Sequence, residues 1–330
     1  MTEKAQKTSR TDLLPDSQAG NRIPRIINHA VVSGATGMIG AHLTRLLLSR
    51  GIRVTALVRP GSKKLDNLPQ ESEFLRIVPC DIKDIRTLET DPADAFFHLA
   101  WSGTEGSTRN DETAQRENVG LILDALHKAK ELGCSVFLGA GSQAEYGFFE
   151  GELKPDTPMD PVTWYGKAKK EAEEKSRKEA EGLGIDHLWV RILSVYGPGD
   201  NAYSLVMQAI RAFLKHEPVA FTKGEQVWDY LYAGDCAEAL LALALYGKNG
   251  SAYPLGKGEK VLLKDYIAMI RDAVDKDIPL NLGGRPYNDH QVMYLTADMS
   301  ALYNDTGYRP ETPFTEGIKK TVSWVRENSL

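Results

Sequence analysis

The sequence lacks the features that mark several large classes of protein. Its three cysteines, Cys80, Cys134 and Cys236, are widely spaced and form no C-x-x-C motif, so no disulfide framework is predicted. The richest apolar run, at 239–246, is far too short to span a bilayer, and residues 1–10 lack the apolar segment of a signal peptide. We therefore predict a cytoplasmic protein that has no membrane partner.

The sequence also lacks a strongly basic composition and a metal-binding motif. The chain has 40 Lys and Arg against 45 Asp and Glu, a net charge of -5, which excludes the basic footprint of a nucleic-acid-binding protein. The seven histidines are scattered without an H-x-x-x-H pair, and we predict no metal site. The absence of a G-x-S-x-G motif leaves hydrolase chemistry without support.

What the chain does contain is a regular alternation of strand-like and helix-like segments. It has 330 residues, 42% of them hydrophobic, which is ample for a large core. Strand-like runs begin near residue 29 and recur after helical patterns, of which the longest covers about 112–132. This alternation is typical of βαβ units, in which helices cover both faces of a parallel sheet. We predict a Rossmann-type α/β fold with a doubly wound parallel sheet and a smaller C-terminal lobe.

A glycine-rich turn follows the first predicted strand and opens a helix. Gly34, Gly37 and Gly40 have the spacing G-x-x-G-x-x-G. Glycines at these points permit a tight turn and close approach of the backbone to a pyrophosphate, which the helix N-terminus stabilises. Glycines can also serve strand–helix packing alone, but the strand–turn–helix context favours a dinucleotide cofactor. The other predicted cofactor contacts in this turn are Thr36, Met38 and Ile39.

The end of the second predicted strand bears on which nicotinamide cofactor is bound. An acidic residue there would bond the adenosine ribose and favour NAD, but the chain has Val58 followed by Arg59. An arginine at this edge can hold a 2′-phosphate, and Lys63 and Lys64 add positive potential, so we predict NADP in preference to NAD. The alternative is a solvated basic loop. Asp81, after the next strand, is placed either to bond the adenine amino group or to close a turn.

The patterns also divide the chain. Residues 1–27 are polar and patternless, and we predict that they form a mobile N-terminal extension. Residues 28–198 are predicted to be the NAD(P)-binding Rossmann domain. After this point the alternation loosens into helices joined by Gly- and Pro-rich loops. Residues 199–330 are therefore predicted to be mainly a substrate-binding lobe, from which strands could return to the sheet.

The run W-Y-G-K-A-K places Tyr165 and Lys169 four residues apart, on one face of a predicted helix. A lysine ammonium beside a phenol stabilises the phenolate and lowers a pKa that is otherwise about 10. Such a tyrosine can give or take a proton near neutral pH while a hydride moves nearby. Because the same spacing also occurs on solvated helix faces, the assignment depends on the upstream glycine turn and on Ser142.

Several further motifs stand in order along the chain. From the N-terminus they are G-A-T-G-M-I-G, C-D-I, F-F-H-L-A, E-N-V, G-S-Q-A-E-Y-G, Y-G-K-A-K and R-I-L-S-V-Y-G-P-G. In this order, over about 29–328, the chain resembles the extended short-chain dehydrogenase/reductase family of NAD(P)-dependent nucleotide-sugar epimerases, dehydratases and ketoreductases. Each motif alone has little weight, whereas the ordered set is specific.

The resemblance implies roles for individual residues. Tyr165 would be the catalytic acid/base on the sugar hydroxyl or carbonyl, and Ser142 would hydrogen-bond the reacting oxygen. Lys169 would bond the nicotinamide ribose and lower the pKa of the tyrosine, in a region that Asn118 fixes. Further cofactor contacts are expected at Ile82, Leu99, Ala100, Trp101, Ile192 and Val195.

Departures from the family pattern narrow the reaction. Dehydratases of the family have T-D-E where this chain has Ser142, Gln143 and Ala144, and neither Gln143 nor Ala144 can move the protons of water elimination. Dehydration is therefore disfavoured. In the lobe, Trp228 replaces one of two arginines that often hold the nucleotide diphosphate, and Arg285 remains in a late element that otherwise differs. We predict that Arg285 contacts the diphosphate, the alternative being an arginine of a surface loop. Trp228 is predicted to stack on a sugar or base ring or to lie in the core.

We therefore predict an NAD(P)-dependent epimerase or ketoreductase that acts at C4 of a nucleotide-activated hexose, with Ser142 and Tyr165 in contact with the substrate. By analogy with the family, a homodimer is predicted to form through the helices near 112–132 and 164–182. Two alternatives stay open. One is an NADPH-dependent ketoreductase of a non-nucleotide carbonyl substrate, and the other is a non-catalytic NADP-sensing protein of the same fold.

Overall fold

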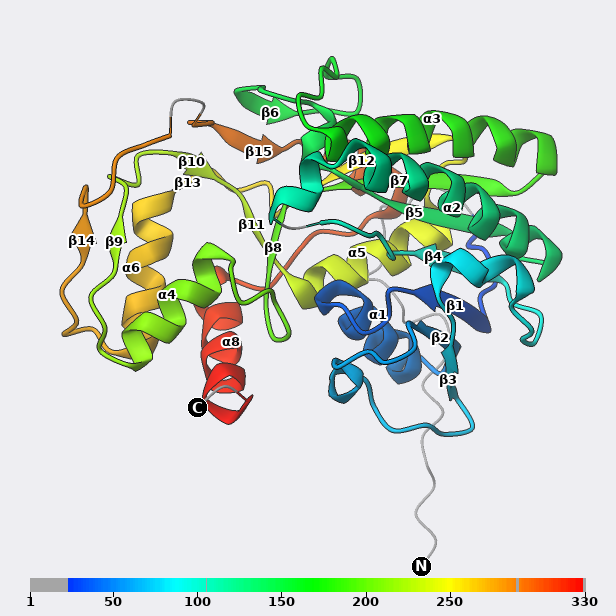
Figure 1. Cartoon of the computed structure of the whole chain (residues 1–330), viewed down its shortest axis with the longest axis horizontal. Helices are drawn as coiled ribbons and strands as arrows, with labels where there is room; N and C mark the ends of the chain where they lie inside the picture. The colour runs from blue at the N-terminus through cyan, green and yellow to red at the C-terminus, as the bar shows by residue number, and fades with distance from the viewer. Residues whose placement is uncertain (1–22, 105, 289–290, 329–330) are drawn as a thin grey trace, which may run out of the picture.

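The computed structural model describes residues 23–104, 106–288 and 291–328, and its centre is a seven-stranded parallel sheet (Figure 1). Along the chain its strands are β1 (His29–Ser33), β2 (Arg53–Val58), β3 (Leu75–Pro79), β4 (Ala95–His98), β5 (Val136–Ser142), β7 (Asp186–Ile192) and β12 (Ser251–Leu255). Their order in the sheet is β12-β7-β5-β4-β1-β2-β3. Strands β2 and β3 therefore lie on one side of β1, and β4, β5, β7 and β12 lie on the other. This reversal of strand order beside β1 creates the topological switch point at which such sheets bind ligands. The predicted Rossmann-type α/β fold is confirmed.

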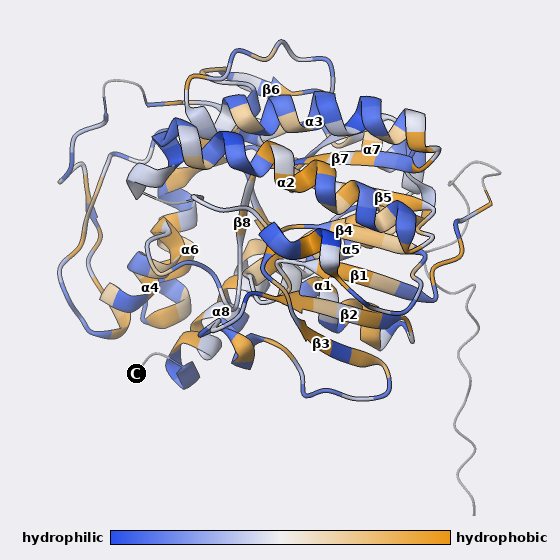
Figure 2. Cartoon of the chain, turned by 45° about the vertical axis from the view of Figure 1, so that its right-hand side comes forward, coloured by the Kyte–Doolittle hydropathy of each residue, from blue (hydrophilic) through white to orange (hydrophobic). Residues whose placement is uncertain are grey.

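Four long helices cover the two faces of the sheet. α1 (Met38–Ser49) and α5 (Ala233–Tyr246) pack together on one face, and α2 (Glu112–Glu131) and α3 (Trp164–Leu183) pack together on the other. In α2, buried positions recur at three- and four-residue spacing, as expected for a helix with one apolar stripe. Figure 2 shows this division, with hydrophobic strands between helices whose outer surfaces are hydrophilic.

The C-terminal lobe lies at the edge where β7 and β12 end (left in Figure 1). Its core is aromatic and includes Phe213, Tyr266 and Phe314. Its helices are α4 (Leu205–Leu214), α6 (Leu263–Val274) and α8 (Phe314–Asn328). Its short strand pairs are β8 (Ser194–Tyr196) with β11 (Tyr230–Tyr232), β10 (Val227–Trp228) with β13 (Val261–Leu262), β9 (Ala220–Phe221) with β14 (Asn281–Leu282), and β6 (Gly151–Leu153) with β15 (Leu295–Ala297).

A buried aspartate fixes the C-terminal lobe to the sheet. Asp229, between β10 and β11, is 1% exposed. Its carboxylate accepts the backbone N–H groups of Lys257 at 2.6 Å, Gly258 at 3.0 Å and Ala297 at 3.0 Å. Because Lys257 and Gly258 follow β12 and Ala297 ends β15, one side chain joins the last sheet strand to two short strand pairs. Asp229 therefore has a structural role.

The chain after residue 198 contributes to both parts of the molecule. α5 and β12 pack with the sheet, as does α7 (Ser300–Thr306) through the buried Leu302. The proposed domain boundary at 198 stays a prediction. Most of the predicted N-terminal extension, residues 1–22, lies outside the described residues. Within the described ranges, no helix is both long and apolar enough to cross a membrane.

Candidate active site

The glycine turn between β1 and α1 forms a cradle that only glycine permits. Gly34 has a φ of 70°, and a Cβ there would lie 2.8 Å from the backbone nitrogen of Ala100. A Cβ on Gly40 would overlap the carbonyl oxygen of Gly34. Gly37 is the N-cap of α1, no side chain caps the helix, and its first turn contains no acidic residue. The helix N-terminus therefore offers free N–H groups to an anion, and the cradle fits the pyrophosphate of a dinucleotide.

The loop after β2 is joined to the glycine turn by Asn67, a residue that sequence reasoning did not select. Asn67, in the 3-10 helix η1 (Leu65–Asn67), donates from Nδ2 to the carbonyl oxygen of Thr36 at 2.9 Å. Arg45 of α1 donates to the carbonyl oxygen of Asn67. Arg59 lies exposed at the end of β2, where its carbonyl oxygen accepts the N–H of Ser62. The loop that contains the predicted phosphate partner is thus anchored to the glycine turn.

The other predicted cofactor contacts lie at the carboxyl edge of the sheet. Leu99 and Ala100 follow β4 and lie against Gly34, whereas Met38 and Ile39 begin α1. Ile192 is paired with Ser142 at the ends of β7 and β5, Val195 lies in β8, and Ile82 begins the 3-10 helix η2 (Ile82–Thr87). The Asp81 carboxylate accepts the N–H of Lys83 at 3.1 Å and so closes the turn after β3.

Ser142 and Tyr165 meet at this edge. Ser142 ends β5, and Tyr165 lies in the first turn of α3, which Thr163 caps by accepting the N–H of Gly166 at 3.1 Å. Burial raises the pKa of the Tyr165 phenol, while its hydrogen bond with Ser142 and the charge of Arg109 lower that pKa. The described geometry thus contains the phenol and hydroxyl pair that the motifs predict.

Lys169 lies one helical turn after Tyr165, and its ammonium is directed at the sheet. Lys169 Nζ donates to the carbonyl oxygen of Ala140 at 2.6 Å, and it lies 3.6 Å from the ring centroid of Trp101 and 5.8 Å from that of Tyr165. Burial lowers the pKa of Lys169 to about 7, although the negative charge of Glu145 opposes this shift. When it is protonated, Lys169 therefore interacts with the Ala140 carbonyl, the Trp101 ring and the Tyr165 ring.

Two side-chain amides of α2 hold the loop between β4 and α2 beside Tyr165 and Lys169. Asn118 Oδ1 accepts the N–H of Ser102 at 2.9 Å, and its Nδ2 donates to the carbonyl oxygen of Ser102 at 3.1 Å. Gln115 Oε1 accepts the indole N–H of Trp101 at 2.9 Å. Asn118 therefore fixes the residue next to Trp101, whose ring faces Lys169. The role of Gln115 was not evident from the sequence.

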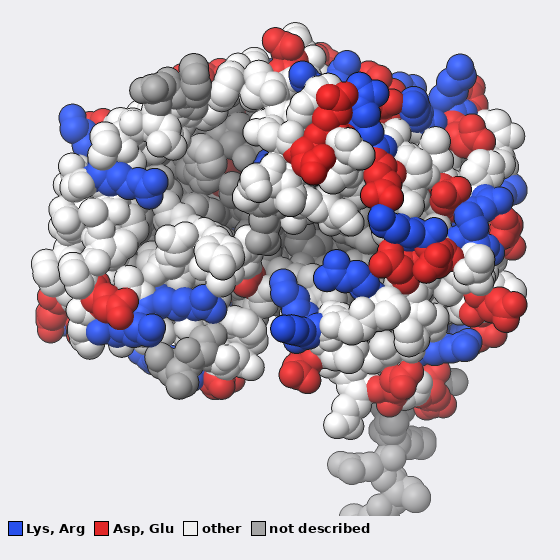
Figure 3. All heavy atoms as spheres, viewed as in Figure 1, with Lys and Arg blue, Asp and Glu red and all other residues white. Residues whose placement is uncertain are grey.

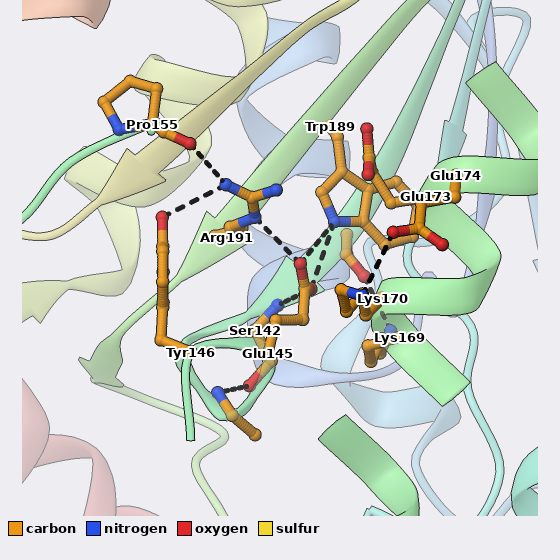
Figure 4. Close-up of polar contacts among 12 residues, drawn as sticks. Ser142, Glu145, Tyr146, Pro155, Lys169, Lys170, Glu173, Glu174, Trp189 and Arg191 are labelled. Carbon is orange, nitrogen blue, oxygen red and sulfur yellow. Dashed lines mark hydrogen bonds and ion pairs between the residues drawn. The ribbon is translucent and has the colours of Figure 1, made fainter. Parts of the chain in front are cut away.

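A buried carboxylate orients Ser142 and was also missed by sequence reasoning (Figure 4). Glu145 is 0% exposed, and its Oε1 accepts the backbone N–H of Ser142 at 2.7 Å. Its Oε2 accepts from Arg191 Nε at 2.9 Å, and both carboxylate oxygens accept the indole N–H of Trp189 at 3.1 Å. Burial raises the pKa of Glu145, and the Arg191 charge and the Ser142 N–H oppose this shift. The hydroxyl of Ser142 in turn accepts the N–H of Ala144 at 3.2 Å.

A cavity of about 390 Å³ lies in the C-terminal lobe. Two of the four predicted substrate residues, Trp228 and Arg285, line it, whereas Ser142 and Tyr165 do not. Trp228 lines it and donates from Nε1 to Ser194 Oγ at 2.9 Å, whereas the backbone N–H of Arg285 donates to the carbonyl oxygen of Phe221 at 3.0 Å. Gln226 is 2% exposed, and no described group bonds its Oε1. Figure 3 shows a hollow between this lobe and the sheet half of the molecule.

No cluster of metal-ligating side chains occurs in 23–104, 106–288 or 291–328. These ranges bring together a phosphate cradle, the half-buried Ser142 with the buried Tyr165 and Lys169, and an aromatic cavity in the adjoining lobe. Such an arrangement can hold a dinucleotide and move a proton at an oxygen of a second ligand.

Comparisons with known proteins agree with this geometry. A model described as the NAD dependent epimerase/dehydratase family matches residues 30–256. The chain is 27% identical over 324 residues to UDP-glucuronate 4-epimerase of Thermodesulfobacterium geofontis (strain OPF15), covering 92% of this chain and 97% of that protein. It is 26% identical over 327 residues to human dTDP-D-glucose 4,6-dehydratase, with 90% of each covered. Its structure is similar to MoeE5 in complex with UDP-glucuronic acid and NAD, with a TM-score of 0.78, 25% identity, and 91% and 99% coverage.

Proposed function

We propose that this chain, which belongs to the NAD dependent epimerase/dehydratase family, epimerises a nucleotide-activated hexose by oxidation and re-reduction at C4. The observation on which the proposal rests is that Ser142, at the end of β5, interacts with Tyr165, which lies one helical turn from Lys169 and beside the phosphate cradle. A bound nicotinamide would supply the redox chemistry, by accepting and returning a hydride at the sugar carbon.

The residues of the chain supply the rest. Tyr165 takes the proton of the sugar hydroxyl as the carbon is oxidised and returns it as the carbon is reduced. Ser142 donates a hydrogen bond to the same oxygen, and Glu145 holds the Ser142 backbone in place. Lys169 bonds the ribose of the cofactor and, when charged, stabilises the phenolate. The cradle around Gly34 and Gly40 binds the pyrophosphate.

Water elimination is disfavoured because the residues after Ser142 cannot move the required protons. Gln143 has an amide that does not ionise near neutral pH, and Ala144 has no polar atom in its side chain. The buried Oε1 of Gln143 also has no partner among the described groups, and it could instead accept a hydrogen bond from the sugar. These residues favour epimerisation over dehydration, although the family contains both activities.

The cavity in the C-terminal lobe supports a nucleotide-linked substrate. Its walls include the rings of Tyr203, Phe221, Trp228 and Tyr230, on which a base can stack, and the cation of Arg285, which can bond a diphosphate. MoeE5 binds a ligand of this class, UDP-glucuronic acid, in its complex with NAD.

The presence of Ser142, Tyr165 and Lys169 disfavours a non-catalytic sensor. The homodimer, through α2 and α3, stays a prediction.

The reaction is tested with purified enzyme, NAD or NADPH, and a panel of UDP-, dTDP-, CDP- and GDP-hexoses. The expected result is conversion of one of them into an isomer of unchanged mass whose NMR spectrum shows inversion at C4. A product lighter by one water, or no conversion of any sugar nucleotide, would contradict the proposal. Non-nucleotide ketones are assayed in parallel, and their reduction alone would support the non-nucleotide alternative.

The basic end of β2 favours a second candidate, an NADPH-dependent ketoreductase of the same class of sugar. Arg59 is exposed where an acidic residue would favour NAD, and a reductase must exchange its cofactor after each turnover. Replacement Arg59→Leu is expected to raise the Kd for NADPH about tenfold and to leave that for NADH unchanged, because only NADPH has the 2′-phosphate.

The matched control is Arg53→Leu, at the opposite end of the same strand, where Arg53 lies 3.9 Å from Asp91. Isothermal titration with both cofactors gives all four affinities. Equal losses for NADPH in the two variants, or an Arg59 variant that binds NADPH normally, would refute the 2′-phosphate contact.

A further inference from the structure

We propose that Arg109, on the loop between β4 and α2, is a positioning residue that stabilises the ionised form of Tyr165 through the face of its ring. This inference rests on the proposed acid/base role of Tyr165. Sequence reasoning did not select Arg109, because it lies 56 positions before Tyr165 and outside the family motifs.

The geometry places a guanidinium on the catalytic phenol. The Cζ atom of Arg109 lies 4.4 Å from the ring centroid of Tyr165. The indole of Trp101, from the same loop, meets the Tyr165 ring edge-on at 6.1 Å between centroids. The phenol ring is therefore enclosed between an arginine and a tryptophan that both come from the loop after β4.

The loop is fastened on both sides of Arg109, so the contact is not that of a free surface side chain. Asn110 Oδ1 accepts the backbone N–H of Trp164, the first residue of α3, at 3.3 Å. Gln115 Nε2 donates to the carbonyl oxygens of Gly103 at 2.7 Å and Thr108 at 2.9 Å. These bonds tie the 3-10 helix η3 (Gly106–Asn110) to both α2 and α3 and fix Arg109 beside the ring.

Arg109 brings a guanidinium to the face of the Tyr165 ring. The other charged or titratable groups that face Tyr165 are Lys169 on its own helix and Glu145 from the 3-10 helix η4 (Gln143–Glu145). Lys169 is buried and bonds Ala140, and the neighbouring His98 at the end of β4 is neutral because burial lowers its pKa to about 3. A guanidinium stays protonated throughout the working range.

A cation on the ring face acts more strongly on a phenolate than on a phenol. With the neutral ring it interacts only with the ring quadrupole, whereas the phenolate has a full negative charge that is partly delocalised over the ring. The contact therefore favours ionisation and lowers the pKa of Tyr165. Arg109 thus offsets part of the rise that burial causes, and Tyr165 reaches the phenolate at a lower pH.

The test titrates Tyr165 directly and needs no substrate. Difluorotyrosine, whose phenol is more acidic than that of tyrosine, is incorporated at position 165, and its ionisation is followed by fluorine NMR. We expect Arg109→Gln to raise the midpoint by about 0.5–1 pH unit and Arg109→Lys to raise it by less, because the lysine keeps the charge. The control Arg116→Gln removes the guanidinium that lies 5.3 Å from the Trp164 ring and should leave the midpoint unchanged.

An unchanged midpoint in Arg109→Gln would overturn the inference, because Arg109 would then have no effect on the ionisation of residue 165. An equal rise in Arg109→Lys and Arg109→Gln would also overturn it, because the effect would then not come from the positive charge. Arg109→Lys keeps the test valid if the glutamine variant does not fold. Because the titration contains no sugar nucleotide, its outcome is separate from that of the proposed reaction. A shifted midpoint in an enzyme that converts no sugar would refute only the proposed function.

Discussion

Replacement Tyr165→Phe is expected to lower turnover by about 100-fold to 10,000-fold, because it removes the hydroxyl that we propose exchanges a proton with the sugar and keeps the ring. The ring still fills the space between Trp101 and Arg109. The affinity for the cofactor should therefore stay within about threefold of that of the parent enzyme, since the phosphate cradle is untouched. Steady-state rates and cofactor titrations measure the two effects separately.

The matched control is Tyr246→Phe, at the end of α5 and beside Asp186, which begins β7. This tyrosine lies at the amino edge of the sheet, opposite the candidate site, so its variant should retain full turnover. Turnover of Tyr165→Phe at a rate close to that of the control would show that another group moves the proton. Loss of cofactor binding in Tyr165→Phe would show instead that the ring position had changed.

Replacement Glu145→Leu is expected to destabilise the protein by about 3–5 kcal/mol, because it leaves the Arg191 guanidinium buried without its counter-charge. Arg191 is 2% exposed, and its remaining partners are the hydroxyl of Tyr146 at 3.3 Å and the carbonyl oxygen of Pro155 at 3.0 Å. Figure 4 shows Glu145 between Arg191, Trp189 and Ser142. Denaturant titration gives the loss in free energy of unfolding.

Two comparisons make the Glu145 experiment specific. Glu316→Leu breaks an ion pair with Lys320 at 2.7 Å whose partners are both more than half exposed, and the expected loss is below about 1 kcal/mol. The double variant Glu145→Leu, Arg191→Leu removes both charges and should recover part of the single-variant loss. A Glu145→Leu variant as stable as Glu316→Leu would contradict the account of this buried pair.

The fold and the central site could be predicted because their signals are local in the sequence. Gly34, Gly37 and Gly40 recur at three-residue spacing between a strand and a helix, and Tyr165 and Lys169 are one helical turn apart. Alternating strands and helices are sufficient to indicate a parallel sheet. These features depend on short-range geometry, which spacing reveals.

The rest of the site depends on contacts between segments far apart in the chain. Glu145 meets Arg191 and Trp189 because β5 and β7 are neighbours in register, and nothing in G-S-Q-A-E-Y-G indicates that its glutamate is buried. Asn67 reaches Thr36, and Arg109 reaches Tyr165, only after the loops have folded over the sheet edge. Such residues are found from the structure because their partners are set by strand order and loop packing.

The measurement that tests the central claim most directly uses the sugar nucleotide found in the panel, prepared with deuterium at C4. The proposed epimerisation predicts that the enzyme converts it into the C4 epimer at unchanged mass, that deuterium stays at C4, and that Tyr165→Phe yields almost none of this product. Loss of the deuterium to solvent, a product lighter by one water, or equal conversion by Tyr165→Phe would contradict the claim that Tyr165 moves a proton during reversible oxidation at C4.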